Sequence, residues 1–199
     1  MTGEKRARPG LRVVKVGGSL FDLPDLGQRL KTWLAEPPSA VNVLLAGGGE
    51  LADVIRRADE RHHLGDSASH WLCIETLGVS AEWLAAIAGA ALIRSLEALL
   101  DSGQTGTTLT VVFDPRGFLR LQEPSLAGGR LPESWQVTSD SIAARLATAL
   151  AADELVLLKS GTAPAYERLE DLAEVGFVDR FFPQAAGMVP RVRFENFRG

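Results

Sequence analysis

Residues Val13–Leu20, with the sequence VVKVGGSL, decide the fold of this chain. The apolar residues Val13, Val14 and Val16 are typical of a strand that is buried on both faces of a parallel sheet. Lys15 is costly in such a strand unless its ammonium group meets an anion. The two glycines that follow allow backbone N–H groups to approach a ligand, and we expect the next residues, Leu-Phe-Asp, to open a helix. Taken alone, the stretch fits either an anion site or a tight strand–helix turn with a solvated lysine.

The same pattern occurs a second time in the chain. Residues Val41–Ala46 form a predicted strand that runs directly into Gly47, Gly48 and Gly49, and a helix is predicted over Glu50–Arg61. In a parallel sheet both glycine clusters lie at the carboxyl edge of the strands, where ligands bind in open α/β folds. Two such clusters at one edge favour a ligand site over chance turns.

Strands and helices alternate along the rest of the chain, which predicts an α/β protein, a three-layer αβα sandwich with a mainly parallel central sheet. Residues 11–199 form one expected domain after a disordered lead-in at residues 1–10. Other predicted strands are Leu109–Phe113, Leu155–Leu158 and Val189–Phe194. Other predicted helices are Asp22–Ala35, Ser67–Leu100 (two helices, or one kinked near Gly78), one capped by Thr138 or Ser139 that runs to Leu150, and Ala165–Val175. We expect a turn at Asp101–Gly106 and an irregular region with a short strand or two up to Pro132.

Composition and charge exclude several classes of function. A net charge of −4 and a pI near 5.4 argue against a nucleic-acid-binding surface. The single cysteine, Cys73, rules out a disulfide within the chain and a thiolate metal cluster, which fits a reducing cytoplasm. The apolar stretch Trp83–Leu100 is interrupted by Arg94 and Glu97, so we expect a buried helix there and no membrane partner. We expect no metal ligands from the protein.

Three motifs, in this order, resemble those of the amino acid kinase family. They are Val14–Ser19 (VKVGGS), Leu45–Glu50 (LAGGGE) and Val137–Ser141 (VTSDS). That family includes aspartate, acetylglutamate, uridylate and isopentenyl phosphate kinases. The resemblance implies the carbamate kinase-like fold and phosphoryl transfer from ATP with Mg²⁺, a chemistry that depends mainly on positioning and positive charge.

Ser69-His70 and Ser134-Trp135 resemble one small branch of the family, which acts in methanofuran biosynthesis. The implied reaction is transfer of the γ-phosphoryl group of ATP to a phosphate monoester, an aminomethyl-furan-methyl phosphate. Two alternatives stay open. One is a carboxylate kinase that forms an acyl phosphate, and the other is a nucleotide- or oxyanion-binding module without turnover.

The resemblance also implies roles for individual residues. Lys15 would neutralise the transferring phosphoryl group, Asp140 would orient the lysines or the metal, and Lys159 would place a second positive charge near the nucleotide. An acceptor that is already a phosphate or carboxylate has no proton to remove, so Asp140 is not expected to act as a general base. The expected ATP- and phosphate-binding residues are Gly17, Gly18, Ser19, Lys159 and Ser160, and the expected acceptor-binding residues are Gly47, Gly48, Gly49, Thr138 and Ser139.

Some positions depart from the family pattern or have simpler explanations. Many members carry a Thr-Asp-Val-Asp-Gly-type loop after the late strand, whereas residues Leu158–Tyr166 here have no aspartate. This leaves the nucleoside base unassigned. Tyr166 fits packing on its own domain better than stacking on a base. His70 fits a structural hydrogen bond better than a substrate contact.

The expected partner is a small-molecule acceptor with a phosphate or carboxylate group. We also expect a homo-oligomer, a dimer or higher. Small side chains allow close helix approach, so the dimer contact is predicted on an alanine-rich stretch that comprises Ala81, Ala85, Ala86, Ala88, Ala90 and Ala91.

Overall fold

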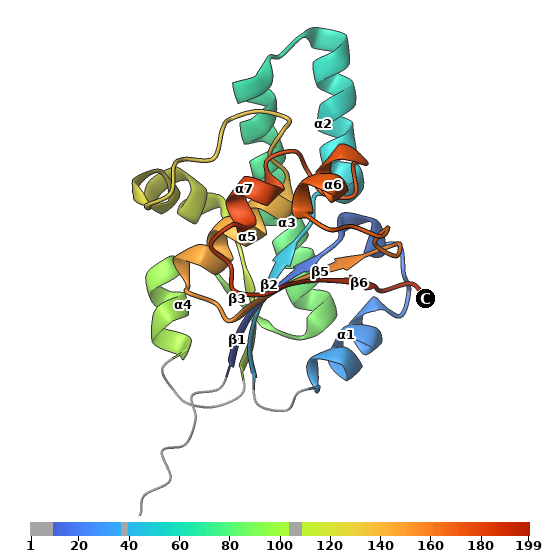
Figure 1. Ribbon diagram of the computed structural model, residues 1–199, viewed down its shortest axis with the longest axis vertical. Helices are drawn as coiled ribbons and strands as arrows, with labels where there is room; N and C mark the ends of the chain where they lie inside the picture. Colours follow the sequence, from blue (N-terminus) through green and yellow to red (C-terminus); the bar gives the residue numbers. More distant parts are fainter. Residues whose placement is uncertain (1–9, 37–39, 104–108) are drawn as a thin grey trace, which may run out of the picture.

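The computed structural model describes residues 10–36, 40–103 and 109–199. Within these residues the strands form one six-stranded sheet in the order β3-β4-β2-β1-β5-β6, and every neighbouring pair is parallel (Figure 1). The strands are β1 (Gly10–Val16), β2 (Ala40–Ala46), β3 (Ala91–Ile93), β4 (Leu109–Phe113), β5 (Glu154–Lys159) and β6 (Val192–Asn196). The predicted parallel α/β sandwich is confirmed.

Helices cover both faces of this sheet. The longer ones are α1 (Leu26–Leu34), α2 (Gly49–His62), α3 (Asp66–Ala88), α4 (Leu96–Gly103) and α5 (Ser139–Ala149). The shorter ones are α6 (Leu169–Glu174), α7 (Phe182–Ala186), a π-helix η2 (Phe118–Gln122) and the 3-10 turns η1 (Gly18–Leu20) and η3 (Glu123–Ser125). Side chains of α1 and of the second half of α3 form the core on one face, and those of α4 to α7 form the core on the other.

Strand β1 lies in the middle of the sheet, between β2 and β5. Its side chains alternate between the two faces, as the pleat of a strand requires. Val14 and Val16 join the core under α1 and α3, whereas Val13 joins the core under α5. Lys15 follows Val13 on the α5 face and is only 6% exposed. The strand therefore holds an ammonium group inside the protein, at the carboxyl edge of the sheet.

The prediction that Leu-Phe-Asp opens a helix is wrong. Only the 3-10 turn η1 follows Gly17, and α1 begins later, at Leu26. Pro24 explains the delay, because proline lacks an N–H group and disfavours helical backbone at the residue before it. Lys15 is therefore followed by a tight turn and not by the N-terminus of a long helix.

The predicted helix over Ser67–Leu100 is also partly wrong. Helix α3 runs without a break to Ala88, then Gly89 adopts a left-handed conformation (φ 61°), and β3 and α4 follow. Gly78 does not kink α3. A Cβ atom at this position would lie 2.2 Å from Nε of Arg116, so the glycine makes room for that guanidinium group.

Among the described residues, α3 is the helix whose length and composition would suffice to cross a membrane. Its second half instead packs on α1 and on strands β2 and β4. The expected buried helix over Trp83–Leu100 is corrected accordingly, because this stretch spans the end of α3, all of β3 and part of α4.

Smaller corrections concern the ends of elements. Residues Asp101–Gly103 belong to α4 and not to a turn, while Gln104–Gly106 and the lead-in at 1–9 lie outside the described residues. Gly10, placed in the lead-in, begins β1. The region up to Pro132 contains η2 and η3 where a strand was expected. The predicted helix over 165–175 shortens to α6, the following α7 was missed, and the last strand lies at 192–196.

The alanine-rich stretch serves the interior of the subunit. Ala81 is fully buried, and Ala85 and Ala88 pack against the same core. On the facing helix α1, a Cβ atom at Gly27 would lie 2.6 Å from the carbonyl oxygen of Ile87. The small residues therefore allow α1 and α3 to approach within one subunit, while Ala86 and Ala91 are exposed and the dimer contact on this stretch stays a prediction.

A buried ion pair holds the segment between η2 and α5. Nε of Arg145 donates to Oε1 of Glu123 at 2.9 Å, and the backbone N–H of Leu131 donates to the same oxygen at 3.0 Å. The two other guanidinium nitrogens donate to the carbonyl oxygens of Leu126 and Ala127. Glu123 and Arg145 are 2% and 5% exposed. This network fixes the loop that leads to the start of α5.

We expect Glu123→Gln to lower the free energy of unfolding by about 3 kcal/mol, because it leaves the buried Arg145 charge without its counter-ion. Urea unfolding measures this change. Asp25→Asn is the matched control, since the exposed pair of Asp25 with Arg29 should contribute less than about 1 kcal/mol. Equal effects of the two substitutions would contradict the structural role of the buried pair.

Candidate functional site

One carboxylate joins two lysines from two strands. Oδ1 of Asp140 lies 2.8 Å from Nζ of Lys15, and its Oδ2 lies 2.6 Å from Nζ of Lys159. Lys15 comes near the end of β1, Lys159 ends the neighbouring β5, and Asp140 lies in the first turn of α5. The three predicted catalytic residues thus come together at the carboxyl edge of the sheet.

The charges of this cluster depend on one another. Burial opposes ionisation of Asp140, but the two ammonium groups outweigh it and hold the pKa of this carboxyl below its usual value. Burial and the charge of Lys15 lower the pKa of Lys159, while Asp140 and Asp179 act in the opposite direction. Two neighbouring ammonium groups are stable here because a carboxylate lies between them.

The start of α5 aims Asp140 at the lysines. Thr138 is the N-cap residue, as predicted, and its Oγ1 accepts from the backbone N–H of Asp140 at 3.4 Å. Its hydroxyl also donates to Oδ2 of Asp179 at 2.8 Å. Ser139, the next residue, is buried and lines the cavity beside Lys15.

The two glycine clusters touch each other through their backbones. A Cβ atom at Gly18 would lie 2.1 Å from the backbone nitrogen of Gly49, and one at Gly47 would lie 2.4 Å from that of Gly18. Gly49 also has a positive φ of 52°. This close approach alone requires glycine at these positions, whatever the loops bind.

Two of the glycine N–H groups already have partners. Gly17 donates to the carbonyl oxygen of Leu158 at 2.9 Å, and Gly47 donates to that of Val16 at 2.8 Å. These bonds extend the ladders of β1 with β5 and β2. The N–H groups of Gly17 and Gly47 are therefore not free to bind phosphate. We propose phosphate binding only for the backbone N–H groups of Gly18 and Ser19.

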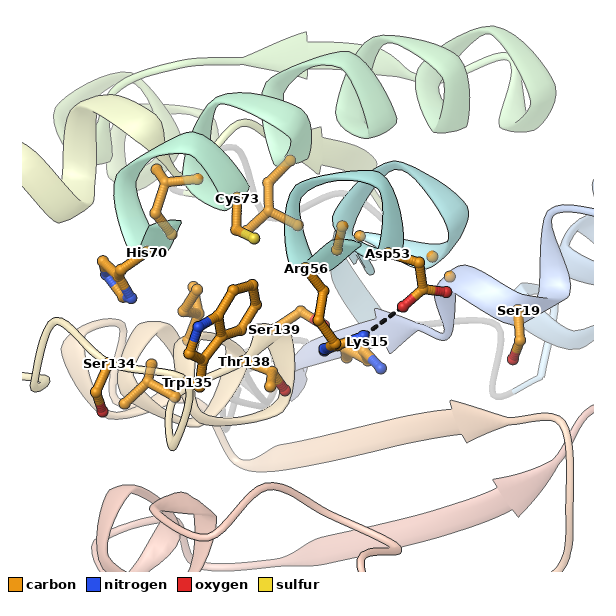
Figure 2. A pocket seen from close by; sticks show the side chains of 18 residues that line it. Lys15, Ser19, Asp53, Arg56, His70, Cys73, Ser134, Trp135, Thr138 and Ser139 are labelled. Atoms are coloured by element: carbon orange, nitrogen blue, oxygen red, sulfur yellow. Dashed lines mark hydrogen bonds and ion pairs between the residues drawn. The ribbon is translucent and has the colours of Figure 1, made fainter. Parts of the chain in front are cut away.

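A cavity of about 220 Å³ opens beside Lys15 (Figure 2). It lies between the glycine loops, helices α2 and α3, and the segment that precedes α5. Of the predicted residues, Lys15, Gly18, Ser19, Gly48, Gly49, Thr138 and Ser139 line it. Its other walls come from Ala52, Asp53, Arg56, His70, Cys73, Ile74, Leu77, Ser134, Trp135, Val137 and Ile142.

The cavity has a cationic end and an aromatic wall. The side chains of Lys15 and Arg56 are both directed into it, and Arg56 pairs with Asp53 one turn earlier in α2 (Figure 2). The guanidinium carbon of Arg56 lies 5.1 Å from the ring centroid of Trp135. Nε1 of Trp135 donates to Oδ2 of Asp59 at 2.8 Å. Helix α2 therefore positions both the arginine and the indole.

His70 and Cys73 line another part of this cavity. His70 is 7% exposed, and burial lowers its pKa against the opposing effects of Glu133 and the backbone of Ser134. Its imidazole is therefore uncharged at neutral pH. Burial raises the pKa of Cys73 to about 11, so its thiol stays protonated. Neither group adds charge to the cavity.

The side of the cluster toward β5 carries the expected nucleotide residues. Oγ of Ser19 donates to Oγ of Ser160 at 3.1 Å, which links the turn after β1 to the end of β5. Tyr166 contacts Phe194 edge-on, with the ring centroids 5.8 Å apart. Its ring packs on its own domain, in agreement with the simpler of the two interpretations.

The residues of this site do not fit a magnesium ion held by the protein. Both oxygens of Asp140 face lysine ammonium groups. Among the residues that the structure describes, there is no group of three His, Cys, Asp or Glu side chains suited to a metal. A magnesium ion would reach the site on nucleotide phosphates, with water as its other ligands.

Arg56, Asp53 and Asp179 were missed in the sequence. Arg56 and Asp53 belong to α2, which the sequence predicts as a helix rich in charged residues. The structure describes every residue of α2, and none of them is buried. Nothing in that pattern distinguishes the arginine that faces the cavity from its neighbour Arg57. Asp179 offered one signal, since it is a single acid within the apolar stretch Phe177–Phe182.

Comparison with known proteins relates this geometry to enzymes. The chain is 28% identical over 148 residues to a [5-(aminomethyl)furan-3-yl]methyl phosphate kinase from Methanocaldococcus jannaschii. The match covers 74% of this chain and 64% of that enzyme. No protein-family model matches the sequence.

Solved structures agree on the fold. A UMP kinase from Bacillus anthracis matches with a TM-score of 0.67 and 11% identity, covering 96% of this chain and 88% of that one. An aspartate kinase from Synechocystis matches with a TM-score of 0.58 and 17% identity, covering 93% of this chain and 38% of that one. The predicted fold of the amino acid kinases is thereby confirmed.

We expect Gly18→Ala to destabilise the protein by about 3 kcal/mol, because its Cβ atom would collide with the backbone of Gly49. Urea unfolding measures the effect. Gly161→Ala is the control, since no atom lies within 4 Å of a Cβ atom there. A fully stable Gly18→Ala protein would show that the loops can separate.

Proposed function

We propose that this chain, which has the fold of the amino acid kinases, transfers the γ-phosphoryl group of ATP to a phosphate monoester on a small planar molecule. The observation that carries this proposal is the cavity into which both Lys15 and Arg56 are directed, with Trp135 as its aromatic wall. The acceptor that we propose is an aminomethyl-furan-methyl phosphate, as in methanofuran-type cofactor biosynthesis. The printed activity of the relative from Methanocaldococcus jannaschii supports this choice.

The acceptor binds in this cavity. Its phosphate group lies between Lys15 and Arg56, because two cations favour a dianion over a neutral hydroxyl group. Its ring lies against Trp135, Ile74 and Leu77, which supply apolar surface. The neutral imidazole of His70 contributes a polar but uncharged contact at the far end.

The nucleotide binds on the side of the cluster toward β5. Gly18, Ser19 and Ser160 hold phosphate oxygens, and Lys159 neutralises negative charge near the β- and γ-phosphates. Mg²⁺ bound to these phosphates screens their charge.

Transfer needs positive charge at the moving phosphoryl group and no general base. Lys15 lies between the two substrate sites, so its ammonium group can follow the phosphoryl group from donor to acceptor. Asp140 keeps Lys15 and Lys159 in place and balances their charges before substrate binds. The acceptor phosphate is ionised at neutral pH, so no proton has to be removed.

We place this enzyme in the cytoplasm as a homo-oligomer. Leu72, Val79 and Trp83 are 42%, 56% and 50% exposed on α3. Their spacing puts them on one face of the helix, which suits contact with a second subunit.

The reaction is tested by incubating the protein with Mg-ATP and the aminomethyl-furan-methyl phosphate, followed by phosphorus NMR. We expect a new diphosphate signal, and we expect Lys15→Ala to reduce its rate of formation roughly 10³-fold. Lys31→Ala, in the exposed last turn of α1, is the control. No product despite ATP binding would favour the binding module without turnover. A product trapped by hydroxylamine, with a carboxylate acceptor, would favour the carboxylate kinase.

The acceptor site is tested separately. We expect Arg56→Ala to raise KM for the phosphate monoester on the order of 30-fold with a smaller effect on kcat, because a charge-assisted contact to the acceptor is lost. Arg57→Ala is the matched control, since Arg57 is exposed on the same helix outside the cavity. Equal KM values for both variants would place the acceptor phosphate elsewhere.

A further inference from the structure

Asp179 receives an unusual number of hydrogen bonds for a single carboxylate. Among the described residues, its Oδ2 accepts from the backbone N–H of Thr138 (3.0 Å), the hydroxyl of Thr138 (2.8 Å) and the backbone N–H of Ser141 (3.0 Å). Its Oδ1 accepts from the hydroxyl of Ser141 and from the backbone N–H of Phe181 (3.1 Å). The carboxylate thus ties the connection between β5 and β6 to the first turn of α5.

The anchored residues flank Asp140. Two of the donors are backbone N–H groups at the N-terminus of α5, which have no partner within the helix. Asp179 accepts hydrogen bonds from these N–H groups although it lies 38 residues after Ser141 and 41 residues after Thr138 in the chain. By fixing Thr138 and Ser141, it fixes the backbone from which Asp140 reaches Lys15 and Lys159.

The same segment also holds Lys159. Nζ of Lys159 donates to the carbonyl oxygen of Phe177 at 2.8 Å and lies 5.2 Å from the centroid of its ring. Phe177 and Asp179 are separated by one residue. The segment Phe177–Phe181 therefore contacts Lys159 directly and holds the residues on either side of Asp140.

We propose that Asp179 is a positioning residue, which sets where Asp140 and the two lysine ammonium groups lie during phosphoryl transfer. The proposal rests on the kinase function proposed above. It assigns a role to the connection between β5 and β6, in the part of the chain that lacks the aspartate-rich loop of many family members. Here Asp179, in the middle of the connection, orders the charged cluster.

Charge gives Asp179 a second effect that simple packing would not have. The charged groups that face Lys159 are Lys15 on β1, Asp140 on α5 and Asp179 itself. Burial and Lys15 lower the pKa of Lys159, and the negative charges of Asp140 and Asp179 oppose this. Without the charge of Asp179, the pKa of Lys159 falls further, and its ammonium group loses its proton at a lower pH.

The test compares Asp179→Asn with the wild-type protein. We expect kcat to fall about 10²-fold with little change in KM for either substrate, because misplaced charges affect the transition state more than binding. We also expect the alkaline limb of the kcat profile to move to lower pH. Asp171→Asn is the matched control, since Asp171 also accepts two backbone N–H groups in this connection but lies at the exposed start of α6.

A second measurement does not depend on turnover. NMR titration of isotopically labelled lysine, with Lys159→Arg to assign the signal, reports the pKa of Lys159 directly, and we expect it to be lower in Asp179→Asn. If the wild-type protein transfers no phosphoryl group, this titration still tests the effect of Asp179, while the kinase function alone fails.

Ser141→Ala covers the case in which Asp179→Asn does not fold. It removes one donor to the carboxylate and leaves the backbone in place, and we expect kcat to fall on the order of tenfold. An unchanged kcat in folded Asp179→Asn, or in Ser141→Ala where only that variant folds, would overturn the proposal. The proposal would also be overturned if Asp179→Asn folds and loses thermal stability, while the pKa of Lys159 and the alkaline limb of its kcat profile stay as in the wild type.

Discussion

The two ion pairs of Asp140 are the constraint on which the rest of this structure depends. Lys15 lies next to the end of β1 and Lys159 ends the neighbouring parallel strand β5, so their ammonium groups would repel each other inside the protein. A carboxylate between them removes that cost only if it is held in place. The fold supplies this through the N-terminus of α5, which covers β1 and β5 at this edge. The order of the strands, the start of α5 and the charge of Asp140 together therefore offset the repulsion between the two lysines.

Around this cluster, the structure separates two tasks. The segments that hold charge, at the ends of β1 and β5 and the start of α5, belong to the sheet and its covering helix. The cavity that would select an acceptor is built from α2, α3 and the segment before α5. Helix α2 contacts the rest of the described protein mainly through α3 and η1. The structure describes all of α2, and none of its residues is buried. Under the proposed function, selection of the acceptor would thus depend in part on α2, a helix with a small share in the core.

Much of the fold follows from local sequence. Strands β1, β2, β4 and β5 have apolar, β-branched or leucine-rich runs, and each falls where the pattern predicts it. Strand β3 could not be predicted from the sequence, because a strand of only three residues shows too little of the alternating pattern. The helix expected at Leu20 was wrong because Pro24 decides the backbone there. In the site, Lys15, Asp140 and Lys159 could be predicted from motifs, but Arg56 and Asp179 could not. Their roles depend on which way a helix faces and on a contact between distant segments.

The contact between the two glycine loops has a consequence for how such a protein can change. Gly18 and Gly49 meet backbone to backbone, so neither of these two positions can carry a side chain. The walls that α2, α3 and the segment before α5 provide do carry side chains that can be exchanged. Under the proposed function, a new acceptor could therefore be selected, by evolution or in the laboratory, without disturbing the charged cluster. The same scaffold would keep the proposed reaction while the proposed substrate changed.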